Sequence, residues 1–148
     1  MLQKAFDCVN HNILLEKLEF YGVLGIENTL FKSYLNNQHQ RTVIKDMWNN
    51  KLSSDWEPVK HGIPQGSILG PMLFLIYIND LARSISKLAN TILFADDTSI
   101  IISSSNQENF KTNINSVMKE IMIWFQSNML TLNCNKTHFL QFLTTNKK

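Results

Sequence analysis

The chain has 148 residues, 44% of them hydrophobic, and a formal net charge of +2 from 14 basic and 12 acidic side chains. This size and composition predict one globular domain over residues 1–148 with a single core, and they exclude the strongly basic surface that by itself identifies many nucleic-acid-binding proteins. Two cysteines are too few for a disulfide framework, and the sequence shows neither a secretory leader nor an apolar run long enough to span a membrane. We therefore expect an intracellular protein with no membrane segment.

The first part of the chain alternates extended and helical patterns. A short extended piece is expected at residues 2–6, followed by a helix from about residue 12 to residue 21 with Gly22 as its stop. Apolar side chains at helical spacing predict the face of this helix that packs in the core: Ile13, Leu14, Leu18 and Tyr21. Three charged residues occupy the opposite face: Glu16, Lys17 and Glu19.

The next segments indicate a helix and a pair of strands. A second helix is expected at about residues 27–36, and the alternating pattern of residues 40–45 predicts a strand. Residues 47–55 are rich in Asn, Ser and Lys and predict a turn, after which Val59 could end a returning strand.

A loop rich in glycine and proline follows at residues 61–71, which hold three glycines and two prolines. Glycine lets the backbone approach a ligand closely. The apolar run after it, residues 72–78, is too short to cross a bilayer. It predicts a buried helix from about residue 71 to residue 84, with Pro71 in the first turn.

Two adjacent carboxylates, Asp96 and Asp97, lie between the apolar runs 92–94 and 98–102. Two such runs around a short polar turn predict a β-hairpin. Carboxylates at its tip could present oxygen ligands to a hard divalent cation, which suits metal-assisted phosphoryl or nucleotidyl transfer. Aspartates are also common in turns because of local hydrogen bonding, so a solvated turn is the alternative.

The rest of the chain predicts a long helix and an extended end. Ser105 and Glu108 have the spacing of a capping box, which would start the helix. Its expected buried face has apolar side chains at intervals of three and four: Phe110, Ile114, Val117, Met118, Ile121 and Phe125. Two extended segments are expected after it, around residues 130–132 and 139–142.

Four segments together resemble a known family. Residues 62–74 (Gly-Ile-Pro-Gln-Gly-Ser-Ile-Leu-Gly-Pro-Met-Leu-Phe) are similar to its template- and nucleotide-contacting motif, and residues 94–97 (Phe-Ala-Asp-Asp) to its catalytic Asp-Asp motif. Residues 4–11 and 128–137 resemble two further motifs in the same order. The chain is thus similar to the palm of a reverse transcriptase, an RNA-directed DNA polymerase, from a non-LTR retrotransposon of jockey or LINE type. This implies an α+β polymerase palm in which a small antiparallel sheet carries the Asp-Asp hairpin and helices pack on one face, with fingers and thumb largely missing.

The resemblance assigns roles near the reacting groups. It implies that Asp96 and Asp97 are catalytic and bind Mg²⁺ or Mn²⁺, and that Lys136 stabilises charge or donates a proton near the pyrophosphate. In the intact family the partners are an RNA template, a DNA primer and a deoxynucleoside triphosphate, and deoxynucleotides are added to the primer 3′-OH by two-metal catalysis. The four histidines show no zinc-ligand spacing with the cysteines, so no zinc site is expected.

Nucleotide and template contacts are also implied by the resemblance. Phe6 matches an aromatic residue that lies under the sugar of the incoming nucleotide and excludes a 2′-hydroxyl, although a Phe between small residues is commonly core. Pro64, Gln65 and Gly66 match the loop that contacts the nucleotide or the templating base, where Gln65 can both donate and accept a hydrogen bond. A loop cap is the alternative for Gln65. Arg41 is a candidate for template or nucleotide phosphate.

One position departs from the family pattern. In the family the first catalytic Asp lies six residues before the residue that Asp7 matches, and here that position is Met1. Asp7 cannot replace it, because six residues of extended strand span about 20 Å, far beyond the reach of Mg²⁺ coordination. A thioether is a soft ligand with little affinity for Mg²⁺. We therefore predict that the chain alone is inactive or nearly so.

Three interpretations stay open. In the first, the chain is part of an RNA-directed DNA polymerase that begins upstream with an Asp in the first motif. In the second, it is a catalytically dead, transposon-derived relic or a nucleic-acid- or protein-binding module, with exposed apolar surface where fingers and thumb would dock. In the third, it is an unrelated α+β domain whose Asp-Asp turn is coincidental.

Overall fold

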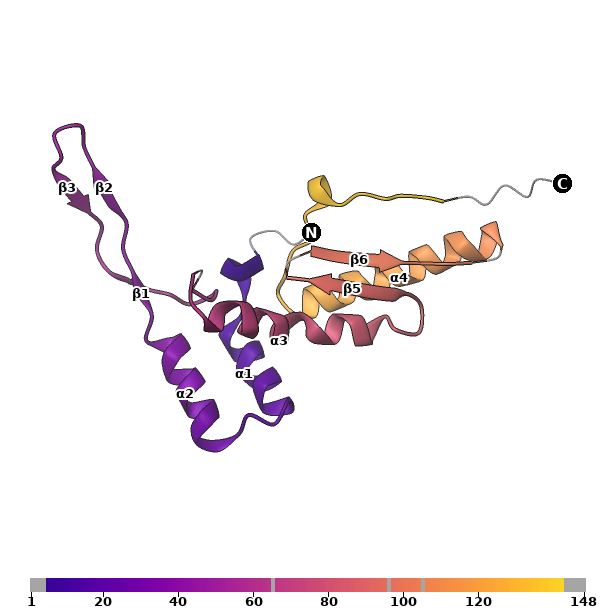
Figure 1. Ribbon diagram of the computed structural model, residues 1–148, viewed down its shortest axis with the longest axis horizontal. Helices are drawn as coiled ribbons and strands as arrows, with labels where there is room; N and C mark the ends of the chain where they lie inside the picture. Colours follow the sequence, from indigo (N-terminus) through magenta and orange to yellow (C-terminus); the bar gives the residue numbers. More distant parts are fainter. Residues whose placement is uncertain (1–4, 65, 96, 105, 143–148) are drawn as a thin grey trace.

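The structure is a computed structural model that describes residues 5–64, 66–95, 97–104 and 106–142 (Figure 1). Its helices and strands follow in this order: η1 (Ala5–Cys8), α1 (His11–Phe20), α2 (Gly25–Asn36), β1 (His39–Gln40), β2 (Val43–Lys45), β3 (Lys51–Ser53), β4 (Glu57–Pro58), α3 (Leu69–Ser84), β5 (Asn90–Phe94), β6 (Asp97–Ile101), α4 (Gln107–Ser127) and η2 (Cys134–Lys136), where η marks a 3-10 helix. The mixture of helices and small antiparallel sheets agrees with the sequence.

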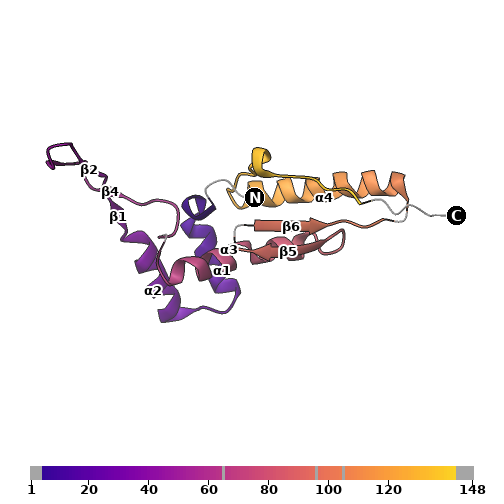
Figure 2. The same cartoon turned by 45° about the horizontal axis from the view of Figure 1, so that its top comes forward.

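The described strands do not form the one small sheet that was expected. They pair as three separate two-stranded antiparallel sheets, β1 with β4, β2 with β3 and β5 with β6. The reason is that β1 to β4 form a ribbon that projects away from the helices, at the opposite end of the molecule from β5 and β6 (Figures 1 and 2).

Helix α3 lies at the centre, with α1 and α2 toward the ribbon and the β5–β6 hairpin and α4 on its other side (Figure 1). Its apolar run is buried only in part: Leu73, Phe74, Tyr77 and Ile78 face the core, whereas Met72 and Leu75, on the other side of the helix, are 44% and 49% exposed. The side chains without solvent exposure or nearly so come from all four α-helices and the segments beside them: Val9, Leu14, Leu18, Leu35, Leu73, Phe74, Tyr77, Ile78, Leu81, Ile85 and Val117. Burying one such side chain contributes about 1.5–3 kcal/mol relative to leaving it exposed. No helix in the described part of the chain is long and apolar enough to cross a membrane.

The helix boundaries agree with the sequence to within about two residues. The side chain of Asn10 caps α1, its Oδ1 accepting from the backbone N–H of Asn12 at 3.0 Å and of Ile13 at 3.2 Å. The helix ends two residues before Gly22, which has φ +92°. Helix α4 is capped by Asn106, whose Oδ1 accepts from the Glu108 N–H at 2.9 Å. Ser105, the expected cap, lies outside the described residues.

Three expected segments are wrong in part. Residues 5–6 belong to η1 and are not extended; residues 2–4 lie outside the described residues. The predicted strand over 40–45 is interrupted between β1 and β2, and the predicted turn over 47–55 contains β3. The physical reason for the shorter turn is Asp46, whose Oδ1 accepts from the N–H groups of Trp48 at 2.9 Å and Asn50 at 2.8 Å and reverses the chain early.

The last segments follow the prediction only to residue 132. Leu130 is buried and Leu132 half-buried, and η2 lies between the two segments that were expected to be extended. Phe139, Leu140 and Phe142 are exposed, and no strand that the structure describes pairs with them.

Candidate functional site

The β5–β6 hairpin presents one covered and one open face. Phe94 pairs with Asp97, so the connection between the strands has only two residues. Ala95, the first of them, has φ +50°, the left-handed conformation that such tight hairpin turns require. Asp97 is exposed and lies directly opposite Phe94, whose ring is 79% exposed. Asp96 lies outside the described residues.

The covered face of this hairpin carries Leu93, Thr98 and Ile100, which are half-buried and alternate with exposed residues. Together with Leu81 of α3 and Ile121 of α4, Thr98 and Ile100 line a small apolar cavity of about 70 Å³. The open face is thus rigidly backed by two helices, which is how a turn can hold a polar side chain in a fixed place.

The glycine-proline loop (residues 61–71) is fastened to the segment that carries Phe6. The N–H of Gly62 donates to the carbonyl of Val9 at 2.8 Å, and the N–H of Ile63 donates to the carbonyl of Phe6 at 2.9 Å. Gly62 has φ +88°, and a Cβ there would lie 3.0 Å from both Cα and O of Asp7. A glycine is therefore needed at this point both for its conformation and for the close approach of the two backbones.

The structure places Phe6 next to the glycine-proline loop, and both were predicted to contact the nucleotide. The ring of Phe6 is half-buried and stacks on the buried ring of Phe74, with centroids 4.7 Å apart. Within the loop, the Ser67 hydroxyl donates to the carbonyl of Pro64 at 2.8 Å and accepts from the N–H of Gly70 at 2.9 Å. Gly66 has φ +83° and open space around it, and Gln65 lies outside the described residues.

Arg41 and Lys136 are not in contact with these groups. The guanidinium of Arg41 lies over the ring of Trp56, 4.7 Å from its centroid, in the ribbon, which Figures 1 and 2 both place at the far end from β5 and β6. Lys136 is exposed on η2. Among the described residues, no three His, Cys, Asp or Glu side chains lie close enough together to hold a metal ion.

A buried histidine beside the loop was not predicted from the sequence. His11, at the first position of α1, is 6% exposed, and its Nε2 lies 2.7 Å from the carbonyl oxygen of Gly62. Its neighbour Asn10 pairs with His61 through a backbone bridge, so the start of α1 and the start of the loop run alongside each other. The sequence places His11 next to the residue that caps α1. No local pattern identifies its hydrogen-bond partner, Gly62, which lies fifty-one residues later.

A cavity of about 290 Å³ opens beside this contact. It is lined by residues of α1, α2 and the segment before Gly62: Asn10, His11, Asn12, Asn36, Pro58, Val59, Lys60 and His61. The lining contains no carboxylate, and most of these side chains are exposed.

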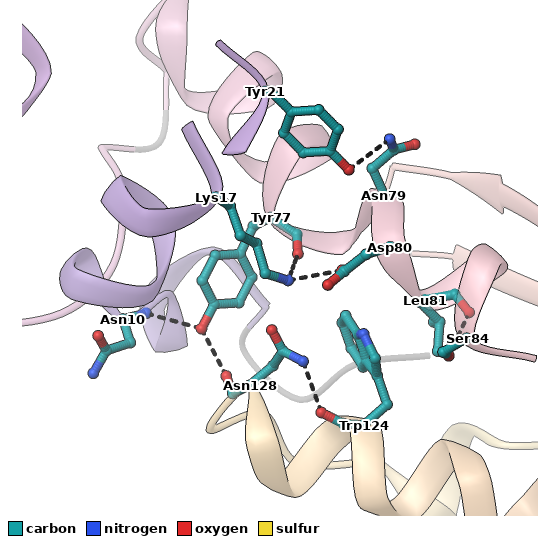
Figure 3. A network of polar contacts seen from close by, with 10 residues as sticks. All are labelled: Asn10, Lys17, Tyr21, Tyr77, Asn79, Asp80, Leu81, Ser84, Trp124 and Asn128. Carbon is teal, nitrogen blue, oxygen red and sulfur yellow. Dashed lines mark hydrogen bonds and ion pairs between the residues drawn. The ribbon is translucent and has the colours of Figure 1, made fainter. Parts of the chain in front are cut away.

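A polar network under the site ties three helices together (Figure 3). The prediction that Lys17 belongs to the polar face opposite the core is wrong: its Nζ donates to the carbonyl of Tyr77 and to Oδ1 of Asp80, at 2.7 Å, and lies over the rings of Tyr77 and Trp124. The carboxylate of Asp80 on α3 attracts the Lys17 ammonium toward the helix junction. The pattern of α1 alone had predicted that this side of the helix faces solvent. Burial lowers the pKa of Lys17 below its ordinary 10.5, and the hydrogen bond and charge of Asp80 only partly oppose this.

Tyr77 completes the network. Its hydroxyl donates to the carbonyl of Asn128 at 2.6 Å and accepts from the N–H of Asn10 at 3.4 Å. Burial raises the pKa of Tyr77 above its ordinary value of 10. The start of α1, the middle of α3 and the end of α4 are thereby held in one arrangement, which sets where η1, the loop and the residues after α4 meet.

Comparison with known proteins gives consistent matches over nearly the whole chain. Residues 2–146 match the family model described as reverse transcriptase (RNA-dependent DNA polymerase). The chain is 26% identical over 148 residues to the probable RNA-directed DNA polymerase from transposon BS of Drosophila melanogaster, covering 92% of this chain and 15% of that protein. It is 26% identical over 150 residues to the corresponding protein from transposon X-element of the same fly, covering 95% of this chain and 15% of that protein.

A third relative comes from another insect. It is the retrovirus-related Pol polyprotein from type-1 retrotransposable element R2 of Popillia japonica, 22% identical over 147 residues, covering 91% of this chain and 22% of that protein. The chain therefore spans less than a quarter of the length of these relatives. The expected resemblance to non-LTR retrotransposon polymerases is confirmed. Because the family model matches almost all of its residues, the chain belongs to the reverse transcriptase (RNA-dependent DNA polymerase) family.

Proposed function

We propose that this chain forms the palm portion of an RNA-directed DNA polymerase, the part that aligns a primer 3′-OH with an incoming deoxynucleotide on an RNA template. The relatives are named as such polymerases. The observation that carries the proposal is the pair of backbone hydrogen bonds that fasten Gly62 and Ile63 to the carbonyls of Val9 and Phe6. They join two motifs that are more than fifty residues apart in the sequence and that both resemble nucleotide-contacting segments.

Asp96 and Asp97 would hold the divalent cation, Mg²⁺ or Mn²⁺. Their carboxylates are the hard oxygen donors that these ions prefer, and the exposed position of Asp97 at the start of β6 leaves it open to a ligand. When bound, the ions would neutralise charge on the attacking and leaving oxygens. The two aspartates are adjacent in the chain, so a further donor from another segment is needed to complete the site.

The neighbouring residues would position the nucleotide. Phe6 is held on one side by its stack on Phe74 and is only half-buried, so part of its ring would be available to a sugar. The carbonyl of Pro64 is tied back by Ser67, and the open space around Gly66 would let a base or sugar approach the backbone. Lys136 and Arg41 would contribute positive charge to phosphates once nucleic acid is bound.

Met1 stands where the family motif has its first Asp, and the family match begins one residue later. We propose that the chain as written has little polymerase activity, because a thioether does not replace a carboxylate in binding Mg²⁺. Changing Met1 to Asp behind an added initiator methionine would supply the missing donor type.

Primer extension on an RNA template with Mg²⁺ or Mn²⁺ tests the proposal. We expect weak or no incorporation by the unmodified chain, measurable incorporation when Asp stands at position 1, and loss of that incorporation on Asp96→Ala or Asp97→Ala. Lys45→Ala in β2 serves as the matched control, because it removes a charge without changing the β5–β6 hairpin. Incorporation that survives both aspartate substitutions would contradict the assigned roles.

The alternative is a binding module without catalysis. The exposed apolar side chains of the ribbon, among them Met47 and Trp48, favour a surface that meets another molecule. A gel shift with RNA or an RNA–DNA hybrid, without incorporation by either the unmodified chain or the variant with Asp at position 1, would support this alternative.

A further inference from the structure

We propose that His11 is a positioning residue that fixes the start of the glycine-proline loop beside Phe6, and thereby positions the loop residues that the proposed function assigns to the nucleotide. The inference deepens the proposed function and rests on it, because the loop and Phe6 matter here as nucleotide contacts. It concerns a side chain to which neither the motif resemblance nor the relatives' names assign a role.

The geometry defines the state of the His11 ring. A carbonyl oxygen only accepts hydrogen bonds, so the Nε2 that lies 2.7 Å from the Gly62 oxygen must carry the hydrogen. The ring is 6% exposed, and the Gly62 backbone is buried beneath it. A water molecule in the adjacent cavity would satisfy that carbonyl but would not attach it to α1.

The His11 contact completes a three-point attachment. The N–H groups of Gly62 and Ile63 bond to the backbone of η1 and Val9, and His11 holds the Gly62 carbonyl from the start of α1. The missing Cβ of Gly62 lets the two backbones meet at van der Waals distance. Because the attachment points come from two elements, residues 62 and 63 cannot pivot about either one alone.

The attachment lies at the near end of the loop, directly before Pro64. The far end is held separately by Ser67, which bonds to both Pro64 and Gly70. Loss of the His11 bond should therefore free the residues between Gly62 and Ser67 while α3 stays in place. A displacement of about 1 Å in such a group is enough to lower productive binding or turnover by up to a hundredfold.

The test compares the chain with His11→Ala and His11→Gln. Gln keeps an amide N–H that can reach the Gly62 carbonyl, whereas Ala leaves it without a donor. The control is Val117→Ala, because Val117 is fully buried in α4 and lies outside the four motif segments. Two quantities are measured in each variant: hydrogen-deuterium exchange of backbone amides, and the equilibrium Kd for dTTP with Mg²⁺.

We expect His11→Ala to speed exchange at Gly62, Ile63 and Ser67 while α3 and α4 keep their protection. Its Kd for dTTP should rise at least about tenfold, and His11→Gln should stay within about threefold of the unmodified chain on the same scale. Val117→Ala should lower the midpoint of thermal unfolding but leave both loop exchange and Kd unchanged.

Two results would overturn the positioning role. One is exchange that rises in α3 and α4 as much as in the loop, in either His11 variant, because this would show that His11 stabilises the whole core. His11→Gln can give this result even if His11→Ala does not fold. The other is unchanged loop exchange and Kd in His11→Ala. If the unmodified chain binds no dTTP but His11→Ala frees the loop locally, the proposed function fails while the attachment of the loop by His11 stands.

Discussion

Two antiparallel hairpins in the described part of the chain have different surroundings: β5–β6, with strands of five residues, and β2–β3, with strands of three. In β5–β6 every second residue is half-buried against α3 and α4, whereas in β2–β3 every residue is exposed. An isolated two-stranded hairpin is marginally stable in water. The first hairpin therefore derives its order from the helices behind it and the second from its turn, and only the first can hold a side chain in a defined place for chemistry.

The strongest way to break this comparison is to place a charge on the covered face. Ile100→Asp should lower the free energy of unfolding by about 3 kcal/mol or more, because an unpaired carboxylate is buried against α3 and α4. The matched change Ile44→Asp, at a residue that is 62% exposed on the ribbon, should stay within about 0.5 kcal/mol. Urea unfolding followed by circular dichroism measures both; equal losses would show that the two hairpins are equally supported.

The same contrast between covered and open positions applies to two glycines. Gly62 and Gly22 have nearly the same backbone angle, φ +88° and +92°, but a Cβ at Gly62 meets the backbone of Asp7 whereas one at Gly22 meets nothing within 4 Å. Gly22→Ala should cost about 1 kcal/mol for the left-handed conformation alone. Gly62→Ala should cost at least about 1 kcal/mol more because of the clash. Scanning calorimetry gives both values, and a Gly62 variant as stable as the Gly22 variant would contradict the close approach of the loop to η1.

Two tyrosine hydroxyls, one in a buried hydrogen bond and one in an exposed hydrogen bond, extend the comparison of covered and open positions. Tyr77→Phe leaves the buried carbonyl of Asn128 without its donor and should cost about 1–2 kcal/mol. Tyr21→Phe removes an exposed contact with Asn79 and should stay within about 0.5 kcal/mol. Guanidinium unfolding of the two variants under the same conditions makes the measurement, and similar losses would show that the network in Figure 3 does not stabilise the helix junction.

The smallest expected effect is a pH dependence that comes from Lys17. Its pKa is lowered in the folded chain, so just below pH 10.5 the unfolded chain binds more protons and the free energy of unfolding rises with pH. Lys17→Met removes this titration, so the unmodified chain should gain stability relative to the variant as pH rises from about 8 toward 10. The comparison stays below pH 10, where Tyr77, whose pKa is raised above 10 by burial, keeps its proton. A difference that stays constant or falls over this range would contradict the dominance of burial over the Asp80 ion pair.

Local sequence patterns were sufficient for the elements whose order comes from their own residues. The stripe of α1, the apolar run of α3 and the two β-rich runs beside the aspartates correctly predicted two helices and an antiparallel strand pair. They were wrong about Tyr21, Met72 and Leu75, which are exposed although the patterns place them in the core. The strand β3 was missed because its pairing depends on the side chain of Asp46 and on no apolar alternation of its own.

The residues of the candidate site could be predicted from the sequence, but the contacts between them could not. Motif residues such as Phe6, Pro64, Asp96 and Asp97 could be named from the sequence, because they belong to short segments with a recognisable composition. The contacts that join them could not, because hydrogen bonds from Ile63 to Phe6 and from Gly62 to Val9 link backbone groups, which every residue has. The roles of the motif residues in catalysis stay predictions until primer extension is measured.

The sequence by itself determined the reverse transcriptase family, the positions of the main helices and the presence of a hairpin at the paired aspartates, since all three depend on residue types at short spacing. Tertiary structure alone decided that Lys17 points into the helix junction, that His11 meets Gly62, and that the strands separate into a backed hairpin and an open ribbon. These features depend on partners that lie at least fifty residues apart or on which face a neighbouring helix covers, and periodicity along one segment carries no information about either.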